Sequence, residues 1–592
     1  MNTSLNVASH LVRMAAEHPT QVAVYAPRGR VRRDGPTEHR AITFRELNAD
    51  SDAIAHGLAS AGVARGTRTA LMVPPSPDFF ALTFALFKVG AVPVLIDPGM
   101  GVRNLGKCLA EAGPEAFIGV AKAHAARRVL GWAKGTVRAT VNVSRWRFFC
   151  DTSLARVRKA GRGSGPYPVP DSQATEPAAV LFTSGSTGVA KGVVYVHGIF
   201  DAQVKLLKAT YGIAPGEIDL CTFPLFALFG PALGMTCVIP DMDASRPARL
   251  DPHKAAAQIK QFGVTSLFGS PAVIRRLGEL TVPSRRVSGP KSENSAAPDS
   301  GPETRRLETL KRVISAGAPA SAASLERFVR LLPDGVEVFT PYGATEALPV
   351  ANIGSREILG ETRHLTDQGK GVCVGRPVPG VEVRVIRISD QPVAEWDDSL
   401  LVPQGEVGEF VVRGPVVTQL YYNRPDATKL AKIRDPKTGE VLHRMGDVGY
   451  FDAQGRLWFC GRKSHRVVTP HGTLFTDMVE PIFNTVPGVR RTALVGVTRR
   501  GITYPVLWVE LDRSSEPGST LFDAVGGPSG PALDGLMSSI GQRSAAARRV
   551  VTYLLHPEFP MDVRHNSKIF REKLAVQADK LFGPNWSPGE QA

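Results

Sequence analysis

Cysteine is scarce in this sequence, and no two cysteines lie close together along the chain. Six are present among 592 residues, and no pair has the C-x-x-C spacing of redox or zinc sites. This spacing argues against both a disulfide framework and a structural zinc site. The composition favours a reducing compartment, so we expect a cytoplasmic protein. The six are Cys108, Cys150, Cys221, Cys237, Cys373 and Cys460.

An unbroken membrane-spanning run is also missing. Residues 220–240 are uncharged and largely apolar, and a stretch of this length could span a bilayer. Prolines and glycines interrupt it and no basic cluster flanks it, which favours a buried strand, turn and helix lining an apolar pocket. The amphipathic pattern around Arg13 and Glu17 is not typical of a signal peptide. We expect no transmembrane segment, and peripheral association with a membrane stays open.

Long runs of lysine or arginine are absent, although the formal net charge is +16. The positive charge is scattered, and basic and aromatic residues do not alternate as they do in nucleic-acid-binding segments. Such a charge suits an anionic membrane, an acidic protein partner or an anionic substrate. We favour a mildly basic enzyme surface that binds no nucleic acid.

The chain instead contains an alternation of strand-like and helix-like segments over residues 1–460. Residues 43–46 (Thr-Phe-Arg-Glu) form a capping box, residues 77–88 read as a helix, and residues 92–96 read as a buried strand. This rhythm predicts an α/β fold with parallel sheets and helices on their faces. Alternating strands follow residue 380, and residues 283–306 are rich in Ser, Pro, Gly and Lys, which predicts a disordered insertion.

The run at residues 183–192 (Thr-Ser-Gly-Ser-Thr-Gly-Val-Ala-Lys-Gly) joins two probable strands. Glycines let backbone N–H groups approach an anion, hydroxyls add donors, and Lys191 adds a positive charge. The run is not a Walker loop, since Gly192 follows the lysine where that motif needs Ser or Thr. A flexible linker is the alternative interpretation. We predict a phosphate-binding loop.

Four further motifs offer groups that could bind a nucleotide. The first two follow probable strands: residues 315–319 (Ser-Ala-Gly-Ala-Pro) and residues 342–346 (Tyr-Gly-Ala-Thr-Glu). The third motif is Gly446-Asp447 with the later Gly461-Arg462, in which Asp447 supplies a carboxylate and Arg462 a guanidinium. Near the end, Lys568 stands before a basic helix. Each motif alone could be a core, turn or surface feature.

In their order and spacing the five motifs resemble the adenylate-forming superfamily of acyl-CoA synthetases, luciferases and nonribosomal adenylation domains, over nearly the whole chain. The resemblance implies a large N-terminal domain, residues 1–463, of parallel-sheet βαβ subdomains plus a β-barrel. A small mobile α+β domain, residues 464–592, would close over it, with the hinge at Ser464. The implied cofactors are ATP and Mg²⁺.

The resemblance also implies roles for individual residues. Thr345 would contact the α-phosphate, Glu346 would bind Mg²⁺, and Lys568 would neutralise charge as the substrate carboxylate attacks. Asp447 would accept the ribose hydroxyls beside Arg462. The remaining nucleotide contacts would come from Thr183, Ser184, Gly185, Ser186, Thr187, Gly188 and Lys191 at the phosphates, and from Gly317, Ala318, Tyr342 and Gly343 at adenine.

Two departures from the acyl-CoA synthetases bear on the second half of the reaction. Where those enzymes commonly carry a lysine and then a glycine after the hinge, this chain has Val468 and His471, which puts CoA chemistry in doubt. Where they carry a histidine near the acyl pocket, this chain has Ala227. A wider tunnel for a long alkyl chain is expected there, lined by Phe226, Ala227, Phe229 and Gly230.

Residues 342–350, 446–450 and 564–569 look like those of the β-lactone synthetases of bacterial long-chain olefin biosynthesis. The implied substrate is a long-chain 2-alkyl-3-hydroxyalkanoic acid, whose β-hydroxyl would close a lactone. The implied partners are other enzymes of that pathway, a β-lactone decarboxylase and a reductase. A long-chain acyl-CoA synthetase or a fatty acyl-AMP ligase is the alternative. His197 and His364 are candidate bases, although either could equally be a core or surface histidine.

Overall fold

The computed structural model describes residues 5–28, 38–144, 150–183, 190–223, 226–280, 307–512, 531–542, 544–545, 547–561, 569–584 and 586. The chain divides into two compact units. The first unit comprises Met1–Pro93, Gly113–Ala178 and Leu207–Thr340. The second unit comprises Val94–Ala112, Ala179–Leu206 and Pro341–Ala592. The predicted insertion at residues 283–306 lies outside the described residues.

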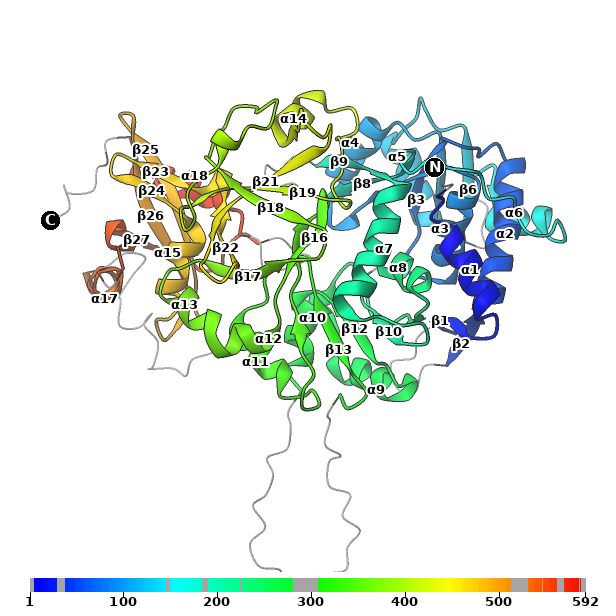
Figure 1. The fold of residues 1–592 in the computed structure, drawn as a ribbon, viewed down its shortest axis with the longest axis horizontal. Helices are drawn as coiled ribbons and strands as arrows, with labels where there is room; N and C mark the ends of the chain where they lie inside the picture. Colours follow the sequence, from blue (N-terminus) through cyan, green and yellow to red (C-terminus); the bar gives the residue numbers. More distant parts are fainter. Residues whose placement is uncertain are drawn as a thin grey trace, which may run out of the picture. The chain divides into compact units, whose positions relative to one another are not determined.

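A seven-stranded sheet in the first unit has the order β14-β13-β12-β10-β11-β1-β2 (Figure 1). Its strands run parallel except for the edge strand β2, which is antiparallel to β1. Short apolar runs form these strands because helices cover them and both faces are buried. The strands are β1 (Val22–Pro27), β2 (His39–Thr43), β10 (Ile218–Cys221), β11 (Thr236–Val238), β12 (Ser266–Gly269), β13 (Arg312–Ser315) and β14 (Val338–Phe339).

Four more parallel strands of the first unit are neighbours in the order β7-β6-β5-β3. They are β3 (Arg68–Met72), β5 (Ala116–Gly119), β6 (Ala139–Asn142) and β7 (Thr152–Ser153). The helices of this unit are α1 (Ser9–Glu17), α2 (Phe44–Ser60), α3 (Pro77–Lys88), α5 (Ala121–Leu130), α6 (Leu154–Gly161), α8 (Phe226–Leu233), α9 (Pro252–Phe262), α10 (Pro271–Leu277) and α11 (Ala322–Val329). Helix α7 (His197–Tyr211) begins in the second unit and ends in the first.

Local sequence signals account for several of these elements. The Thr43 hydroxyl accepts a hydrogen bond from the Glu46 N–H, and the Glu46 carboxylate accepts one from the Thr43 N–H, which completes the predicted capping box of α2. Helix α3 has the predicted bounds, with Pro77 in its first turn, where the missing N–H costs nothing. The apolar stretch 220–240 contains the end of β10, α8 and β11, as predicted.

The second unit contains two parallel strands, a third strand beside them and a large antiparallel sheet. The parallel strands β4 (Val92–Ile96) and β8 (Pro177–Thr183) pair from Val94 to Ile96, and β9 (Lys191–Val196) is the neighbour of β8. The antiparallel sheet has the order β15-β16-β17-β22-β21-β19-β18, with β20 also paired to β21. Its strands are β15 (Tyr342–Ala344), β16 (Ala347–Asn352), β17 (Val372–Pro377), β18 (Glu382–Ile386), β19 (Gly408–Arg413), β20 (Lys432–Arg434), β21 (Val441–Phe451) and β22 (Leu457–Arg462).

After residue 462 the chain forms two small sheets, β23-β24 and β25-β26-β27. The second of these has an apolar cluster on each face, one of which includes Phe483 and Leu507 and the other Trp508 and Leu574. The strands are β23 (Val467–Thr469), β24 (Gly472–Leu474), β25 (Val489–Arg499), β26 (Ile502–Leu511) and β27 (Thr552–Leu555). The helices of the second unit are α4 (Val102–Ala112), α12 (Ser355–Glu357), α13 (Arg363–Asp367), α14 (Pro425–Ala431), α15 (Thr476–Phe483), α17 (Pro531–Gly541) and α18 (Arg571–Phe582).

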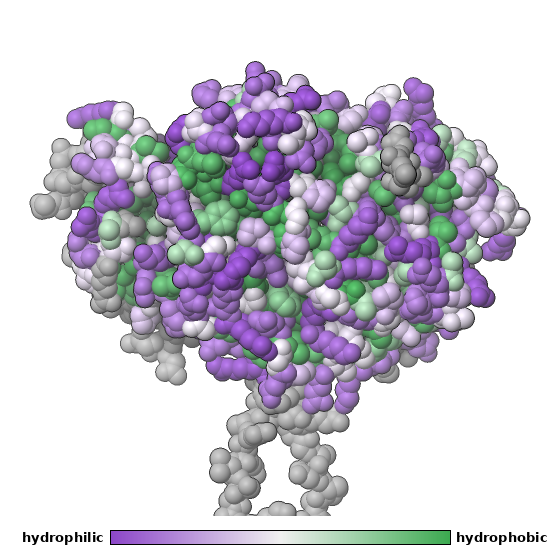
Figure 2. Space-filling model, in the orientation of Figure 1, coloured by the Kyte–Doolittle hydropathy of each residue, from purple (hydrophilic) through white to green (hydrophobic). Residues whose placement is uncertain are grey.

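The predicted α/β class is therefore confirmed. The antiparallel sheet begins at Tyr342, earlier than the change to alternating strands that the sequence predicts after residue 380. On the face drawn in Figure 2, hydrophilic side chains predominate, whereas the apolar clusters are buried. Among the described residues, no helix combines the length and the apolar character needed to cross a bilayer. The predicted boundary between residues 463 and 464 stays a prediction.

Candidate functional site

Thr345 and Glu346 form the two-residue turn between β15 and β16. The two strands pair as an antiparallel hairpin, with Ala344 opposite Ala347. The Glu346 carbonyl accepts hydrogen bonds from both the N–H and the hydroxyl of Thr418, at 2.9 and 3.0 Å. The Tyr421 hydroxyl donates to Glu346 Oε1 at 2.6 Å. One glutamate is thus fixed at both its backbone and its carboxylate.

The same turn is held from the side of β9 and α7. The Tyr195 hydroxyl donates to the Thr345 carbonyl at 2.6 Å, and Gln203 Nε2 donates to the Leu348 carbonyl at 2.9 Å. Tyr195 is buried, and this burial raises the pKa of its hydroxyl well above the usual value, so it stays a donor. These two bonds fix the hairpin from a segment far away in sequence.

Two lysines lie over the ring of Tyr421. Lys191, the first residue of β9, has its Nζ 5.1 Å from the ring centroid, and Lys432 Nζ lies at 6.0 Å. Strand β9 meets this segment through the Tyr422 N–H, which donates to the Gly192 carbonyl at 2.7 Å. Lys191 is therefore brought close to Glu346 by way of Tyr421, although the two are far apart in sequence.

Lys432 is a buried amine in this cluster. Its Nζ donates to the carbonyl of Thr418 at 2.5 Å and to the Thr418 hydroxyl at 3.2 Å. Burial lowers the pKa of Lys432 to about 7, while the charge of Glu346 opposes this shift. Because Thr418 in turn holds Glu346, Lys432 supports the turn through one intermediate residue.

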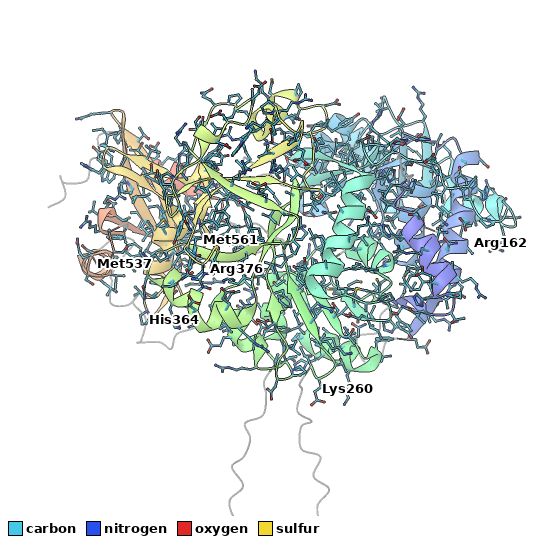
Figure 3. All side chains as sticks on the ribbon, viewed as in Figure 1. Arg162, Lys260, His364, Arg376, Met537 and Met561 are labelled. Atoms are coloured by element: carbon cyan, nitrogen blue, oxygen red, sulfur yellow. The ribbon has the colours of Figure 1, made fainter. Side chains whose placement is uncertain are left out.

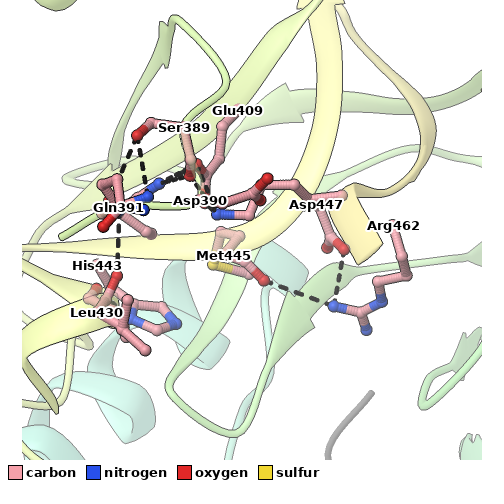
Figure 4. Close-up of polar contacts among 12 residues, drawn as sticks. Ser389, Asp390, Gln391, Glu409, Leu430, His443, Met445, Asp447 and Arg462 are labelled. Carbon is pink, nitrogen blue, oxygen red and sulfur yellow. Dashed lines mark hydrogen bonds and ion pairs between the residues drawn. The ribbon is translucent and has the colours of Figure 1, made fainter. Parts of the chain in front are cut away.

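Asp447 and Arg462 face each other on neighbouring strands, as Figure 4 shows. They are register partners in the antiparallel pair of β21 and β22, and Arg462 Nη1 lies 2.7 Å from Asp447 Oδ1. The Tyr342 hydroxyl donates to Asp447 Oδ2 at 2.6 Å. Burial raises the pKa of Asp447, and the Arg462 charge and the Tyr342 hydrogen bond oppose that rise. The carboxylate and the guanidinium that the sequence offers thus form an ion pair, with Tyr342 as its third member.

A ribose fits the chemistry of this group. Asp447 Oδ1 is buried, and within the described part of the chain it accepts no well-aligned hydrogen bond, although the guanidinium is close. A buried carboxylate oxygen with spare acceptor capacity suits a hydroxyl donor. Arg462 and Tyr342 fix the carboxylate in place before any ligand arrives.

A magnesium ion fits Glu346 only with ligands from elsewhere. Among the described residues, no group of three or more His, Cys, Asp or Glu side chains is placed to hold a metal. Mg²⁺ usually takes one or two carboxylates and completes its shell with phosphate oxygens and water. A single anchored carboxylate therefore suits an ion that arrives with a nucleotide.

A second polar cluster lies beside the hinge predicted at Ser464. Lys463 Nζ lies 3.1 Å from Glu409, and Arg444 Nη2 lies 2.6 Å from the same carboxylate. Arg444 and Glu409 are almost fully buried, each with about 1% of the side chain exposed. Ser464 itself is exposed. The residue before the predicted hinge is thus anchored to the antiparallel sheet.

Other predicted residues lie in the first unit. Gly317 and Ala318 follow β13, and Gly317 has φ +96°, a conformation that favours glycine. Phe229 and Gly230 lie on α8, where a Cβ on Gly230 would stand 2.2 Å from Cys237 Sγ, so the helix packs tightly on β11. Phe226 and Ala227 open this helix, and their side chains are outside the description. Ser184, Gly185, Ser186, Thr187, Gly188 and Lys568 lie outside the described residues altogether, as does the side chain of Thr183.

The candidate bases differ in exposure. His197 is buried at the first residue of α7, whereas His364 is exposed on α13 (Figure 3). Neither assignment as a base is tested by these positions. Gly343 lies in β15, next to Tyr342.

Sequence reasoning missed the residues that support the turn: Tyr195, Thr418, Tyr421 and Lys432. They lie on three separate segments, and only folding gathers them around Glu346. The lone signal was a lysine with apolar neighbours at residues 430–433, which is too common a pattern to identify a buried amine.

The sequence matches the model of the AMP-binding enzyme family over residues 11–422. An olefin beta-lactone synthetase of Stenotrophomonas maltophilia is 48% identical over 586 residues, which covers 98% of this chain and 99% of the relative. Its namesake in Xanthomonas campestris pv. campestris is 46% identical over 581 residues, 98% of each chain. A long-chain-fatty-acid–CoA ligase of Salmonella typhimurium is 26% identical over 494 residues, 77% of this chain and 78% of the relative.

Solved structures share the fold. An amide bond synthetase from Marinactinospora thermotolerans aligns with a TM-score of 0.72 at 21% identity, over 97% of this chain and 100% of that one. The o-succinylbenzoate coenzyme A synthetase of Bacillus subtilis, solved with ATP and a magnesium ion, aligns with a TM-score of 0.66 at 20% identity, over 95% and 98%.

Proposed function

The chain belongs to the AMP-binding enzyme family, and on that premise we propose that it is an ATP-dependent β-lactone synthetase. The proposed substrate is a long-chain 2-alkyl-3-hydroxyalkanoic acid, and the products are a β-lactone, AMP and pyrophosphate. The observation that carries the proposal is the identity of 46–48% to two olefin beta-lactone synthetases over 98% of the chain. The fatty-acid–CoA ligase is only 26% identical over a shorter stretch.

The anchored carboxylates support the first half-reaction. ATP supplies a leaving group that a free carboxylate lacks, because the acid becomes a mixed anhydride with AMP. We assign Asp447 and Arg462 to the ribose, Tyr342 and Gly343 with Gly317 and Ala318 to adenine, and Thr345 to the α-phosphate. Glu346 would hold Mg²⁺. Lys191 and Lys568 would offset the negative charge that gathers during nucleotidyl transfer.

Intramolecular attack supports the second half-reaction. The β-hydroxyl oxygen would attack the activated carboxyl carbon, its proton would leave, and AMP would depart with the electron pair of the broken C–O bond. A nucleophile held beside its target is worth an effective concentration of about 10⁵–10⁸ M. No second substrate is then needed, which agrees with Val468 and His471 at positions where CoA-using relatives commonly carry lysine and glycine.

The proposed acyl site and domain motion complete this account. We assign the alkyl chains to the neighbourhood of Phe226, Ala227, Phe229 and Gly230, on the tightly packed helix α8. Residues 464–592 would form a mobile domain that turns about Ser464. We also propose that the protein acts in the cytoplasm, beside a β-lactone decarboxylase and a reductase.

The test is a product assay with and without coenzyme A. The purified protein is given ATP, Mg²⁺ and a 2-alkyl-3-hydroxyalkanoic acid, and the products are followed by mass spectrometry. The proposal expects β-lactone and AMP without coenzyme A, and no product from the matched acid that lacks the β-hydroxyl. A coenzyme A thioester of a simple fatty acid as the main product would instead identify an acyl-CoA synthetase. Release of free acyl-AMP would identify a fatty acyl-AMP ligase.

A further inference from the structure

More than half of the net charge of the chain comes from one short segment. Residues 121–162 contain eleven Lys or Arg residues and one acidic residue, Asp151, which gives a net charge of +10 out of +16 for the whole protein. At most two of these basic residues are adjacent in the sequence, so no run of them stands out. Their concentration within 42 residues is nonetheless far above that of the remaining chain.

The fold gathers part of this charge at one edge of the first unit. Helices α5 and α6 each follow a strand of the parallel set, and a helix that follows a parallel strand runs back toward the edge where the strands begin. The last turns of α5 and α6 therefore lie at the same edge as Arg138, which directly precedes β6. We name this the basic edge, made of the exposed residues Arg128, Val129, Leu130, Lys134, Arg138, Lys159 and Arg162.

Both helices are anchored on their inner sides, so the basic edge is a fixed surface. On α5, the ring of His124 is fully buried, and its Nε2 lies 3.0 Å from the Val141 carbonyl. On α6, Arg158 pairs with Asp50 of α2 at 2.7 Å, and a Cβ on Gly161 would stand 2.0 Å from the Ala53 carbonyl oxygen. Figure 3 labels Arg162 at the margin where Figure 1 places α6. Figure 2 draws purple side chains there among paler and green ones.

Two apolar side chains stand exposed within this charged surface. Val129 is 84% exposed, the highest value among the large hydrophobic residues of the described chain, and Leu130 next to it is 48% exposed. Gly131 then ends α5 in the left-handed conformation, with φ +65°, and Trp132 turns back toward the interior. Basic residues at the end of a helix commonly offset the helix dipole, and Arg162, the C-cap of α6, fits that role. The same role does not explain Lys134 and Arg138, which lie beyond the end of α5, or the exposed Val129.

We propose that the basic edge docks on an anionic membrane surface, with Val129 and Leu130 inserted among the lipid headgroups. Basic residues around a small apolar tip are the combination that binds such a surface, because charge attracts the protein and apolar insertion holds it. An acidic protein or a nucleic acid would match the charge but would leave the apolar tip unexplained. This inference goes beyond the proposed enzymatic function and does not depend on it.

The test measures sedimentation of the full-length protein with phosphatidylcholine vesicles, prepared with and without phosphatidylglycerol, at low and at high salt. The key variant combines Arg128→Glu, Lys134→Glu and Arg138→Glu. The control variant combines Lys370→Glu, Lys429→Glu and Lys437→Glu, three exposed lysines of the second unit, and changes the net charge equally.

The wild-type protein is expected to bind the anionic vesicles and not the neutral ones. Since each basic residue near an anionic surface contributes roughly fivefold in affinity, reversing three should weaken binding at least about a hundredfold. The control variant should lose less than about threefold, because none of its three lysines belongs to the basic edge. Val129→Ser with Leu130→Ser should keep the low-salt binding and lose the binding that survives high salt.

Equal binding to neutral and anionic vesicles would overturn the proposal, and so would an equal loss in the key and control variants. Binding to DNA or to an acidic polypeptide, with no binding to vesicles, would also overturn it. Lactone formation from detergent-dispersed substrate should be unchanged in the key variant. That measurement separates a failure of docking from a failure of the proposed function.

Discussion

Asp447→Asn is the substitution that most directly probes the nucleotide site. The carboxylate is 2% exposed, accepts a hydrogen bond from Tyr342 at 2.6 Å, and lies 2.7 Å from Arg462. Asparagine keeps the shape of the side chain but removes its charge. If both ribose hydroxyls donate to this carboxylate, the variant loses two charge-assisted hydrogen bonds, each worth about 1.5–3 kcal/mol. The sum corresponds to roughly 10²- to 10⁴-fold weaker ATP binding.

Stability should change much less than binding. Arg462 keeps 31% of its side chain exposed and can be solvated when its partner is lost, and asparagine relieves the burial of the carboxylate charge. We expect destabilisation of about 1–2 kcal/mol, below the usual cost of breaking a fully buried pair. Thermal melting without nucleotide checks that the variant is folded.

Calorimetric titration with ATP and with its 2′,3′-dideoxy analogue completes the experiment. The wild-type protein should prefer ATP, and Asp447→Asn should bind both nucleotides equally weakly. Asp452→Asn is the matched control, because Asp452 pairs with Arg456 at 2.7 Å in the same hairpin of β21 and β22 but outside the proposed ribose site. If Asp447→Asn binds ATP as the wild type does, or still discriminates between the two nucleotides, the ribose assignment is refuted.

Three further substitutions test other parts of the account. Tyr421→Phe removes the 2.6 Å hydrogen bond to Glu346, and we expect roughly a tenfold loss of kcat/KM with a higher Mg²⁺ requirement in a pyrophosphate-release assay, whereas Tyr422→Phe should match the wild type. Asp219→Asn tests a fully buried carboxyl whose pKa is raised by burial to about 7. Between about pH 4 and 7 the folded protein keeps this proton while the unfolded chain loses it. The stability of the wild type should therefore fall as the pH rises through that range, and the stability of the variant should fall less, as measured by thermal melting. Lys568→Ala should abolish adenylation with an unchanged melting temperature, and unaltered pyrophosphate release would remove Lys568 from the mechanism.

Local patterns made a good part of the fold predictable. The capping box at Thr43 fixed the start of α2, and Pro77 marked the start of α3, because these signals act through neighbours in sequence. The pairing of Asp447 with Arg462 was also accessible, since the two belong to one hairpin of adjacent strands.

The shell around Glu346 was not predictable for the opposite reason. Tyr421 lies 75 residues away from Glu346 and Tyr195 lies 150 residues away from Thr345, so no sequence spacing connects them. Lys432 sits on the three-residue strand β20, too short for a periodic pattern, and its burial depends on what β21 and Thr418 place around it. The charge concentration in residues 121–162 can be counted in the sequence, but the structure is needed to show which of these residues are exposed.

The central claim is that the β-hydroxyl oxygen attacks an activated carboxyl carbon, and isotope labelling tests it most directly. A substrate labelled with ¹⁸O in both carboxylate oxygens is converted with ATP and Mg²⁺, and the products are analysed by mass spectrometry. The account predicts one ¹⁸O in AMP and one in the lactone carbonyl, with an unlabelled ring oxygen. Both ¹⁸O atoms in the lactone and none in AMP would show that the hydroxyl had been activated instead, and would contradict it.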